Sequence, residues 1–313
     1  MPANLPPQYF EAEKAYRSAK SAPEKVEALE KMLAIMPKHK GTDHLRAELR
    51  RRIAKLTQAS EKRLATQRAS MIIEKEGAAQ VAVIGLPNAG KSQLVSSITN
   101  ASPIVAEYPF TTHSATPGMM EFENIQIQLI DTPPLVPQSI DPWFRHLLIR
   151  ADALLVIVDL TDAPLAQVEA IITQLENMKI EIVKKKALII GSKLDLAGSS
   201  QNYAALQNRY KEQLPIMAIS AREGAGLEEL KAEIYKVLGI IRVYTKAPGE
   251  KPDFNDPIIL ERGSTLADAA ADVHKDFRAK LKFARVWGSG KHDGMMVKRD
   301  HVLQDGDVIE LHI

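Results

Sequence analysis

The residues with the clearest chemical potential form one short stretch, Gly85-Leu86-Pro87-Asn88-Ala89-Gly90-Lys91-Ser92. A glycine, four further residues and then Gly-Lys-Ser form the pattern of a phosphate-binding loop. The β-branched run before the loop predicts a buried strand, and the apolar spacing after it predicts a helix. Backbone N–H groups at such a helix start can hold an anion. The residues expected to line the nucleotide site here are Gly85, Pro87, Asn88, Ala89, Gly90, Lys91, Ser92 and Gln93.

Two further stretches carry groups that can hold Mg²⁺ beside those phosphates. Thr112, with Thr111 as the alternative, follows the predicted helix, where its hydroxyl can bind the metal and its N–H the γ-phosphate. Asp131 ends a predicted strand and can hold Mg²⁺ through a water, with a strand cap as the alternative. The predicted metal ligands are therefore Ser92, Thr112 and Asp131. The candidates for a part in catalysis are Thr112, Lys91 and Asn88.

Base recognition is predicted for two stretches that follow later strand-like runs, Ser192-Lys193-Leu194-Asp195 and Ser220-Ala221. The Asp195 carboxylate can accept bonds from the ring N–H and the exocyclic amine of guanine, which adenine does not offer. We expect this carboxylate to be buried, so that adenine would leave its lone pairs unpaired. The stem of Lys193 can lie along the base plane, and a backbone N–H at Ser220-Ala221 can bond the guanine carbonyl.

These stretches can share one site only if the elements between them form one sheet. Strand-like runs are expected at Val81–Leu86, Met119–Phe122, Ile125–Asp131, Ala153–Asp159, Ala187–Gly191 and Ile216–Ile219. Helical runs are expected at 92–100, 142–150, 164–178, 202–212 and 226–238. This alternation predicts a mostly parallel sheet covered by helices on both faces, with its ligand at the carboxyl ends of the strands.

Two different patterns flank this region. The first part of the chain is expected to be helical and partly basic. The last part has strand-like runs at Pro257–Leu260, Phe283–Trp287 and Val308–Ile313 around a helical run near Thr265–Val273, which predicts a small β-grasp-like α+β domain. The predicted domains are 1–78, 79–242 and 243–313.

Composition restricts the class of protein. The 313 residues are 45% hydrophobic with a net charge of +2, as expected for a globular protein of two or three domains. The absence of cysteine excludes disulfides, thiolate catalysis and cysteine-based zinc sites. No signal-peptide pattern and no apolar run of membrane-spanning length occur, so we expect a cytoplasmic protein.

Two basic regions can contact RNA. On the helix expected after residue 42, the apolar stripe Leu45, Leu49, Ile53 and Leu56 is surrounded by Arg46, Arg50, Arg51, Arg52 and Lys55. This helix either binds RNA phosphates or has a solvated basic face, and both interpretations stay open. In the last domain, Phe283 and Trp287 lie among basic residues. Strand alternation favours an inward, core position for both rings over RNA stacking.

The order of these motifs makes the chain resemble the Obg superfamily of GTPases, most closely its DRG (developmentally regulated GTP-binding) branch. The residues that carry this resemblance are Gly85–Ser92, Tyr108–Thr112, Pro117-Gly118 and Ile127–Pro133. Gly263–Asp268 and Phe283–Gly288 resemble the TGS domain of that branch, and His44-Leu45 with the following helix resembles its N-terminal segment. The resemblance implies a P-loop, Ras-like G domain, a helical N-terminal region and a C-terminal TGS domain. It also implies a slow GTPase switch that acts around ribosomes or translation.

The chain departs from the pattern of this class after Asp131. Such GTPases place glycine three residues after the aspartate, whereas this chain has Thr132-Pro133-Pro134. Because Pro134 has no N–H and a fixed φ, it cannot bond the γ-phosphate as the glycine does. We therefore expect γ-phosphate sensing to be weakened or rerouted, hydrolysis to be slow, and the GTP and GDP forms to differ less.

Three other positions bear on base binding and catalysis. Ser192 stands where the family usually has asparagine, so guanine affinity is expected to fall while Asp195 keeps specificity. Leu135 stands where some GTPases have a water-orienting glutamine, and the nearest glutamine is Gln138. In potassium-dependent relatives the residue that matches Asn88 binds K⁺ beside the phosphates. A loop-stabilising amide is the alternative for Asn88.

The leading hypothesis is a GTP- and GDP-binding protein that hydrolyses GTP slowly with Mg²⁺ and is linked to the ribosome or translation. K⁺ is a second candidate cofactor. The alternative is a nucleotide-sensing module that binds RNA or protein with little or no hydrolysis. An ATP-dependent kinase is disfavoured by Ser192–Asp195 and by the lack of a substrate lid. The expected partners are GTP and, through the basic helix and the TGS domain, the ribosome or RNA, with no membrane. The oligomeric state does not follow from the sequence.

Overall fold

The computed structural model describes residues 6–19, 22–37, 42–55, 73–99, 115–136, 142–289 and 292–312. The chain divides into two compact units, Met1–Ile72 and Ile73–Ile313. Among the described residues, no helix combines the length and the apolar character that a membrane span needs. The predicted domain limits at 78 and 242 stay predictions.

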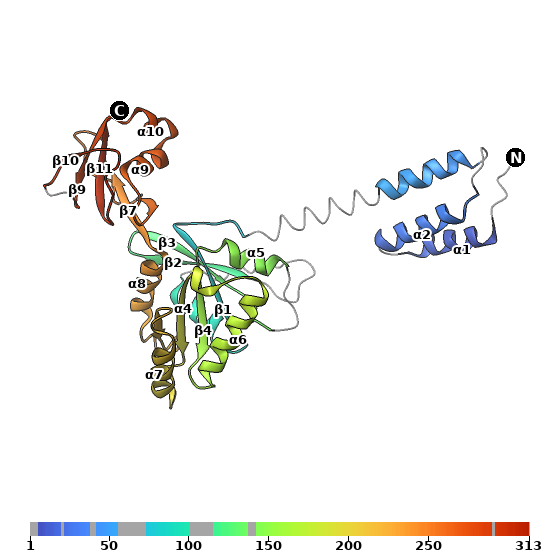
Figure 1. The fold of residues 1–313 in the computed structure, drawn as a ribbon, viewed down its shortest axis with the longest axis horizontal. Helices are drawn as coiled ribbons and strands as arrows, with labels where there is room; N and C mark the ends of the chain where they lie inside the picture. Colours follow the sequence, from blue (N-terminus) through green and yellow to red (C-terminus); the bar gives the residue numbers. More distant parts are fainter. Residues whose placement is uncertain are drawn as a thin grey trace. The chain divides into compact units, whose positions relative to one another are not determined.

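The first unit is helical, as expected. It contains α1 (Pro7–Ser18), α2 (Ala22–Ile35) and a further helix over residues 43–55 (Figure 1). Tyr9, Leu29, Met32 and Leu49 form its buried core. Leu45 and Ile53 pack against this core, so the predicted apolar stripe is confirmed for its described members, and Leu56 lies outside the described residues. Arg50, Arg51 and Lys55 are exposed on the same helix.

The second unit begins with a six-stranded sheet of order β2-β3-β1-β4-β5-β6, in which only β2 is antiparallel to its neighbour. Its strands are β1 (Ala79–Gly85), β2 (Thr116–Phe122), β3 (Ile125–Asp131), β4 (Ala153–Asp159), β5 (Lys186–Ser192) and β6 (Ile216–Ala218). Its helices are α4 (Lys91–Ile98), α5 (Pro142–Arg150), α6 (Pro164–Asn177), α7 (Ser199–Tyr210) and α8 (Leu227–Leu238), with a short 3₁₀ turn at Ile182–Lys184. The predicted mostly parallel α/β fold is confirmed.

Helices cover both faces of this sheet. Apolar side chains of α4 and α8 join alternate residues of β1, β3, β4 and β5 in one core. On the opposite face α6 packs on β4 and against α7. The strands β1, β4 and β5 are buried along nearly their whole length, as parallel strands between two helical layers must be.

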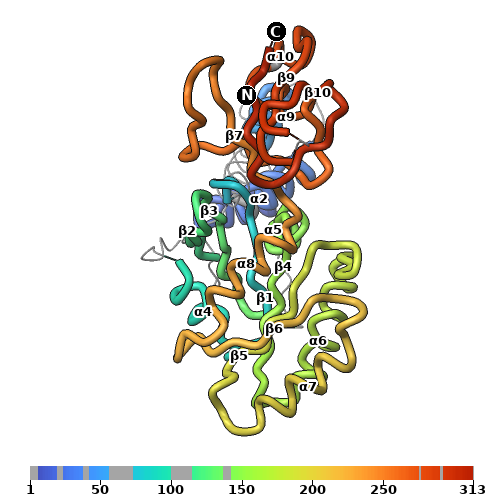
Figure 2. The backbone as a smooth tube through the Cα atoms, turned by 90° about the vertical axis from the view of Figure 1, so that its left-hand side faces the viewer, coloured from blue at the N-terminus to red at the C-terminus, as the bar shows by residue number. Residues whose placement is uncertain are grey.

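The second sheet has five strands in the order β10-β9-β11-β7-β8. They are β7 (Ile240–Thr245), β8 (Ile258–Glu261), β9 (Phe283–Trp287), β10 (Met295–Val297) and β11 (Asp307–His312), with helices α9 (Leu266–Val273) and α10 (Lys275–Lys280). The chain passes from α8 into β7 through Gly239 alone, whose φ of 57° ends the helix (Figure 2). No strand was predicted at β7, and the predicted limit at residue 242 falls inside it.

The prediction that Phe283 and Trp287 point into the core is wrong. In β9 the buried residues are Ala284 and Val286, which pack with Leu266 and Ala269 of α9. Alternation therefore places Phe283, Arg285 and Trp287 together on the opposite face, where Arg285 is exposed and both rings are half-buried. The strand does alternate, but the small side chain of Ala284 fits beneath the helix and the large rings do not.

Candidate nucleotide-binding site

The loop Gly85–Ser92 joins β1 to α4 at the carboxyl edge of the first sheet. A Cβ at Gly85 would lie 2.5 Å from the Ile157 carbonyl oxygen in β4, so no larger residue fits there. Gly90 precedes α4 with a φ of 94°, which favours glycine. Asn88 also has a left-handed φ, of 61°, which asparagine tolerates better than most residues. Pro87, Asn88 and Gln93 are exposed.

Lys91 is buried beneath this loop. Its Nζ donates hydrogen bonds to the carbonyl oxygens of Gly85 (3.1 Å) and Leu86 (3.0 Å). Burial lowers the pKa of Lys91, while the nearby Asp131 carboxylate opposes that shift. The ammonium group therefore bonds carbonyl oxygens of the loop, and no carboxylate among the described residues is bonded to it.

Ser92 and Asp131 meet beside Lys91. The Ser92 hydroxyl donates to Asp131 Oδ2 at 2.5 Å, while Asp131 Oδ1 is buried and has no hydrogen-bond partner in the described part of the chain. Burial raises the pKa of Asp131, with the bond from Ser92 and the charge of Lys91 opposing. A hydroxyl and a carboxylate with an unused oxygen form the hard oxygen donor set that Mg²⁺ prefers. The described residues at this place therefore fit the predicted metal.

The segment after Asp131 is bonded to β1. The Thr132 hydroxyl donates to the Val83 carbonyl oxygen (2.7 Å), and the Leu135 N–H donates to the Gly85 carbonyl oxygen (3.1 Å). Pro133 and Pro134 between them have no N–H to donate. The first backbone donor after the two prolines is thus already paired with the phosphate-binding loop. Thr111, Thr112 and Gln138 lie outside the described residues.

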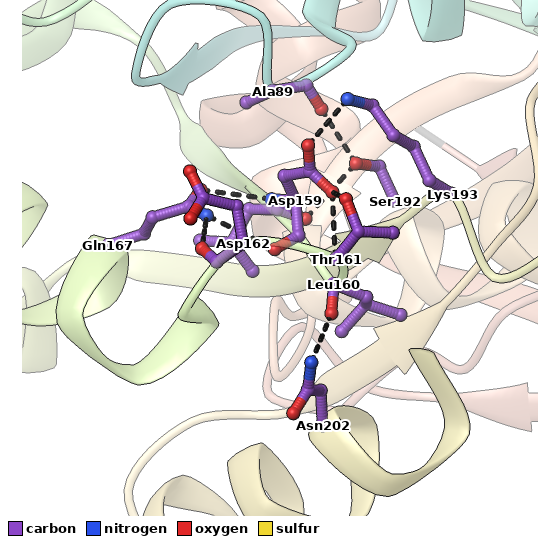
Figure 3. Close-up of polar contacts among 10 residues, drawn as sticks. Ala89, Asp159, Leu160, Thr161, Asp162, Gln167, Ser192, Lys193 and Asn202 are labelled. Atoms are coloured by element: carbon purple, nitrogen blue, oxygen red, sulfur yellow. Dashed lines mark hydrogen bonds and ion pairs between the residues drawn. The ribbon is translucent and has the colours of Figure 1, made fainter. Parts of the chain in front are cut away.

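Ser192 ties β5 to the phosphate-binding loop. Its hydroxyl lies between the Ala89 carbonyl oxygen (2.7 Å) and the Val158 carbonyl oxygen (3.1 Å), and the side chain is buried (Figure 3). Although serine is shorter than the asparagine that is usual at this position in the family, the Ser192 side chain still reaches the phosphate-binding loop.

Asp195 is held by a second serine. The Ser220 hydroxyl donates to Asp195 Oδ1 at 2.7 Å, and this bond is the main cause of the lowered pKa of Asp195. The Leu194 N–H donates to the Ile219 carbonyl oxygen, so the loops after β5 and β6 are joined. The expected burial of Asp195 is wrong: the residue is exposed at the rim, since it follows β5 by a short loop. Ser220 is buried and Ala221 half-buried beside it.

The sequence analysis missed the partner of Lys193. Lys193, whose φ is 62°, donates from Nζ to Asp159 Oδ2 at 2.5 Å. Partial burial would raise the pKa of Asp159, but bonds from Lys193 and Thr161 lower it overall. Asp159 ends β4 as Asp131 ends β3, so the strand-end argument applied to Asp131 could have found it. Figure 3 shows this pair beside the Ser192 contact with Ala89.

Comparisons with known proteins give two family-model matches and several relatives of similar length. The model of the 50S ribosome-binding GTPases matches residues 80–193, and the TGS domain model matches residues 241–313. An uncharacterized GTP-binding protein of Methanocaldococcus jannaschii is 27% identical, with 93% of this chain and 92% of that protein covered. Developmentally-regulated GTP-binding protein 1 of Xenopus laevis is 27% identical, with 76% and 83% covered. Ribosome-interacting GTPase 1 of Saccharomyces cerevisiae is 25% identical, with 92% and 98% covered.

The chain is similar to the DRG proteins in both its GTPase region and its TGS region. The resemblance drawn from the motifs is confirmed, and so is a guanine-nucleotide ligand. The similarity to GTPases does not favour the alternative of a binding module without hydrolysis. The first sheet gathers Lys91, Ser92, Asp131, Ser192 and Asp195 at its carboxyl edge. The role of each of these residues stays a prediction.

Proposed function

We propose that this chain is a Mg²⁺-dependent GTPase that hydrolyses GTP slowly and acts as a nucleotide switch on the ribosome. The observation that carries the enzymatic part is the Ser92–Asp131 pair beside the buried Lys91. Lys91 and the loop N–H groups would hold the phosphates, while Ser92, Asp131 and Thr112 would hold the metal. When bound, Mg²⁺ would neutralise charge on the β- and γ-phosphates.

Base specificity is assigned to the opposite side of the site. Ser220 holds the Asp195 carboxylate, which would accept from the guanine ring N–H and amine. The base itself would cover the exposed carboxylate. Lys193, fixed by Asp159, would place its stem against the ring, and an N–H at Ser220-Ala221 would meet the carbonyl.

Slow hydrolysis follows from the segment after Asp131. Pro134 cannot donate to a γ-phosphate, and Leu135 is buried with its N–H bonded to Gly85. Water must then be oriented by backbone, metal or a partner. K⁺ bound by Asn88 is one source of extra charge at this place. The left-handed φ of Asn88 is equally well explained by a loop-stabilising amide.

Single-turnover hydrolysis of GTP with Mg²⁺ tests the enzymatic proposal, with nucleotide occupancy measured in the same samples. We expect measurable but slow turnover in K⁺, and an increase in the Pro134→Gly variant because glycine restores an N–H. Occupied protein without turnover would overturn the hydrolase assignment. Equal rates in Na⁺ and K⁺ would remove the role of K⁺, and an unchanged Pro134→Gly rate would remove the argument from Pro134.

Ribosome binding, and with it a cytoplasmic location, is proposed from the names of the matched family and the yeast relative and from the exposed basic residues of the first unit. Arg50, Arg51 and Lys55 lie on one helix, where each could neutralise a phosphate. Changing all three to glutamine should lower cosedimentation with ribosomal subunits by roughly tenfold and reduce its salt dependence. The matched control changes Lys14, Lys25 and Lys31 to glutamine. Equal losses of cosedimentation in the two triple variants would contradict a specific basic contact.

A further inference from the structure

Arg242 forms a buried junction between the two sheets of the second unit. It lies in β7, and its side chain is only 10% exposed. Its guanidinium donates to both oxygens of Asp305, from Nε at 3.1 Å and from Nη2 at 2.8 Å, and its backbone N–H donates to the same carboxylate at 2.7 Å. Its Nη1 donates to Glu123 and to Asn124 Oδ1. One side chain thus binds the β2–β3 turn and the turn before β11.

Aromatic rings complete this junction. The guanidinium carbon lies 5.1 Å from the centre of the Tyr235 ring, and the Tyr235 hydroxyl donates to Asp305 Oδ1 at 2.6 Å. On the β2 side, Phe122 stacks on Tyr235 with ring centres 5.0 Å apart. An arginine stacked on an aromatic ring and bonded in fork geometry to a carboxylate has a fixed direction that lysine could not reproduce.

Asn124 adds a second link from the same turn. Its Nδ2 donates to the Tyr244 hydroxyl and to the Phe254 carbonyl oxygen, both at 2.8 Å. Glu123 has a φ of 50°, a conformation that strains most residues other than glycine and asparagine. In this conformation the Glu123 side chain bonds Arg242. The turn is therefore shaped to meet the TGS domain.

The other end of this hairpin belongs to the nucleotide site. β2 and β3 pair in unbroken register, from Phe122 opposite Ile125 at the turn to Thr116 opposite Asp131. Asp131 bonds Ser92, and Thr116 comes shortly after Thr112 in the sequence. β3 is also paired with β1, from Ala79 opposite Ile127 to Val83 opposite Asp131, so this ladder is the outer part of the first sheet. The hairpin is thus a direct connection between the expected metal site and the TGS domain.

The charges of the junction are stable around neutral pH. Burial would raise the pKa of Asp305, but the bonds from Arg242 and Tyr235 lower it overall. Asp305 in turn raises the pKa of Arg242. Arg242 pairs with Asp305 and with the exposed Glu123, so losing the turn carboxylate leaves the buried guanidinium bonded to Asp305 alone.

We propose that Arg242 is a positioning residue for the nucleotide site, which it couples to the TGS domain through the β2–β3 hairpin. This inference rests on the proposed nucleotide switch. If the nucleotide shifts the Asp131 end of the hairpin, the Glu123–Asn124 turn transmits that shift to β7 and to the turn at Asp305. Because coupling between two sites is reciprocal, a partner bound to the TGS domain would change the preference between GTP and GDP by the same factor.

The test uses the full chain with GDP or a non-hydrolysable GTP analogue. Glu123→Ala combined with Asn124→Ala removes the side-chain contacts of the turn with Arg242, while Arg242→Lys keeps the charge and loses the fork. Glu121→Gln is the matched control, because Glu121 is exposed on the same hairpin. Hydrogen exchange over residues 240–245 and 303–309 reports the TGS side, and affinities for both nucleotides report the site. Thermal unfolding checks that each variant is folded.

In the parent chain and the Glu121→Gln control, exchange over these segments should differ between the two nucleotides. In the turn variant the difference should vanish, and the ratio of the two affinities should change by roughly fivefold. The coupling is wrong if the parent chain binds both nucleotides without a difference in exchange, if the turn variant retains that difference, or if the control loses it too. A parent chain that binds neither nucleotide would overturn the proposed function as well.

Discussion

Replacing Lys91 by methionine should lower the affinity for both GTP and GDP by about 100-fold, or about 3 kcal/mol. The Nζ group is buried beneath the phosphate-binding loop and already bonds two of its carbonyl oxygens. A phosphate that replaces these acceptors gains a charge-assisted bond in a place with little water. Methionine keeps the length of the stem and its packing, so the loss should come from charge and not from a cavity.

Titration with a fluorescent guanine nucleotide measures this effect. Lys211→Met, an exposed position at the end of α7, is the matched control for the loss of one positive charge. The control should bind as the parent chain does. If the folded Lys91→Met variant bound the nucleotide as tightly as the parent chain, the loop would not hold the phosphates as we assign them.

Changing Asp195 to asparagine should change the preferred base from guanine to xanthine. The carboxylate accepts two hydrogen bonds from guanine, whereas an amide presents one acceptor and one donor. Xanthine has an oxygen in place of the guanine amine and so matches the amide. Affinity for GTP should fall by at least about 100-fold while affinity for XTP rises, because a mismatch leaves polar groups unpaired.

Competition of GTP, XTP and ATP for the same site measures this exchange. Asp162→Asn, an exposed carboxylate close to Asp159 in the sequence, is the control and should leave the order of affinities unchanged. If the Asp195→Asn variant still preferred GTP, base recognition would have to be assigned to other residues. Binding of ATP as tight as GTP in the parent chain would have the same consequence.

The first sheet could be predicted closely because its strands are buried on both faces. Runs such as those of β4 and β5 are continuously apolar, and each ends at a polar residue that marks the carboxyl edge. β7 was not predicted, because a single glycine separates it from α8 and no turn precedes it. The direction of the rings in β9 depends on which face α9 covers, and alternation alone does not specify that face.

The parts of the candidate site that lie in one continuous stretch of sequence could be predicted. The parts that depend on contacts between residues far apart in the sequence could not. The stretch Gly85–Ser92 encodes its own geometry, so its placement between β1 and α4 matched the expectation. The contact of Ser192 with Ala89 and the pairing of Lys193 with Asp159 join residues far apart in sequence. The exposure of Asp195 depends on a loop, and Arg242 gave no motif at all. Such pairs become visible only once the strands are placed.

The position of β7 has a consequence for how the protein forms during its own synthesis. β7 lies between β8 and β11, and Ile241 and Val243 are buried only in the completed second sheet. All strands of the first sheet are translated before β7, whereas Asp305 and β11 are translated after every other strand. The G domain can therefore fold on the ribosome while β7 still presents an unpaired, apolar edge. A chain arrested between residues 245 and 305 would expose that edge to chaperones and proteases, and Arg242 would still lack Asp305.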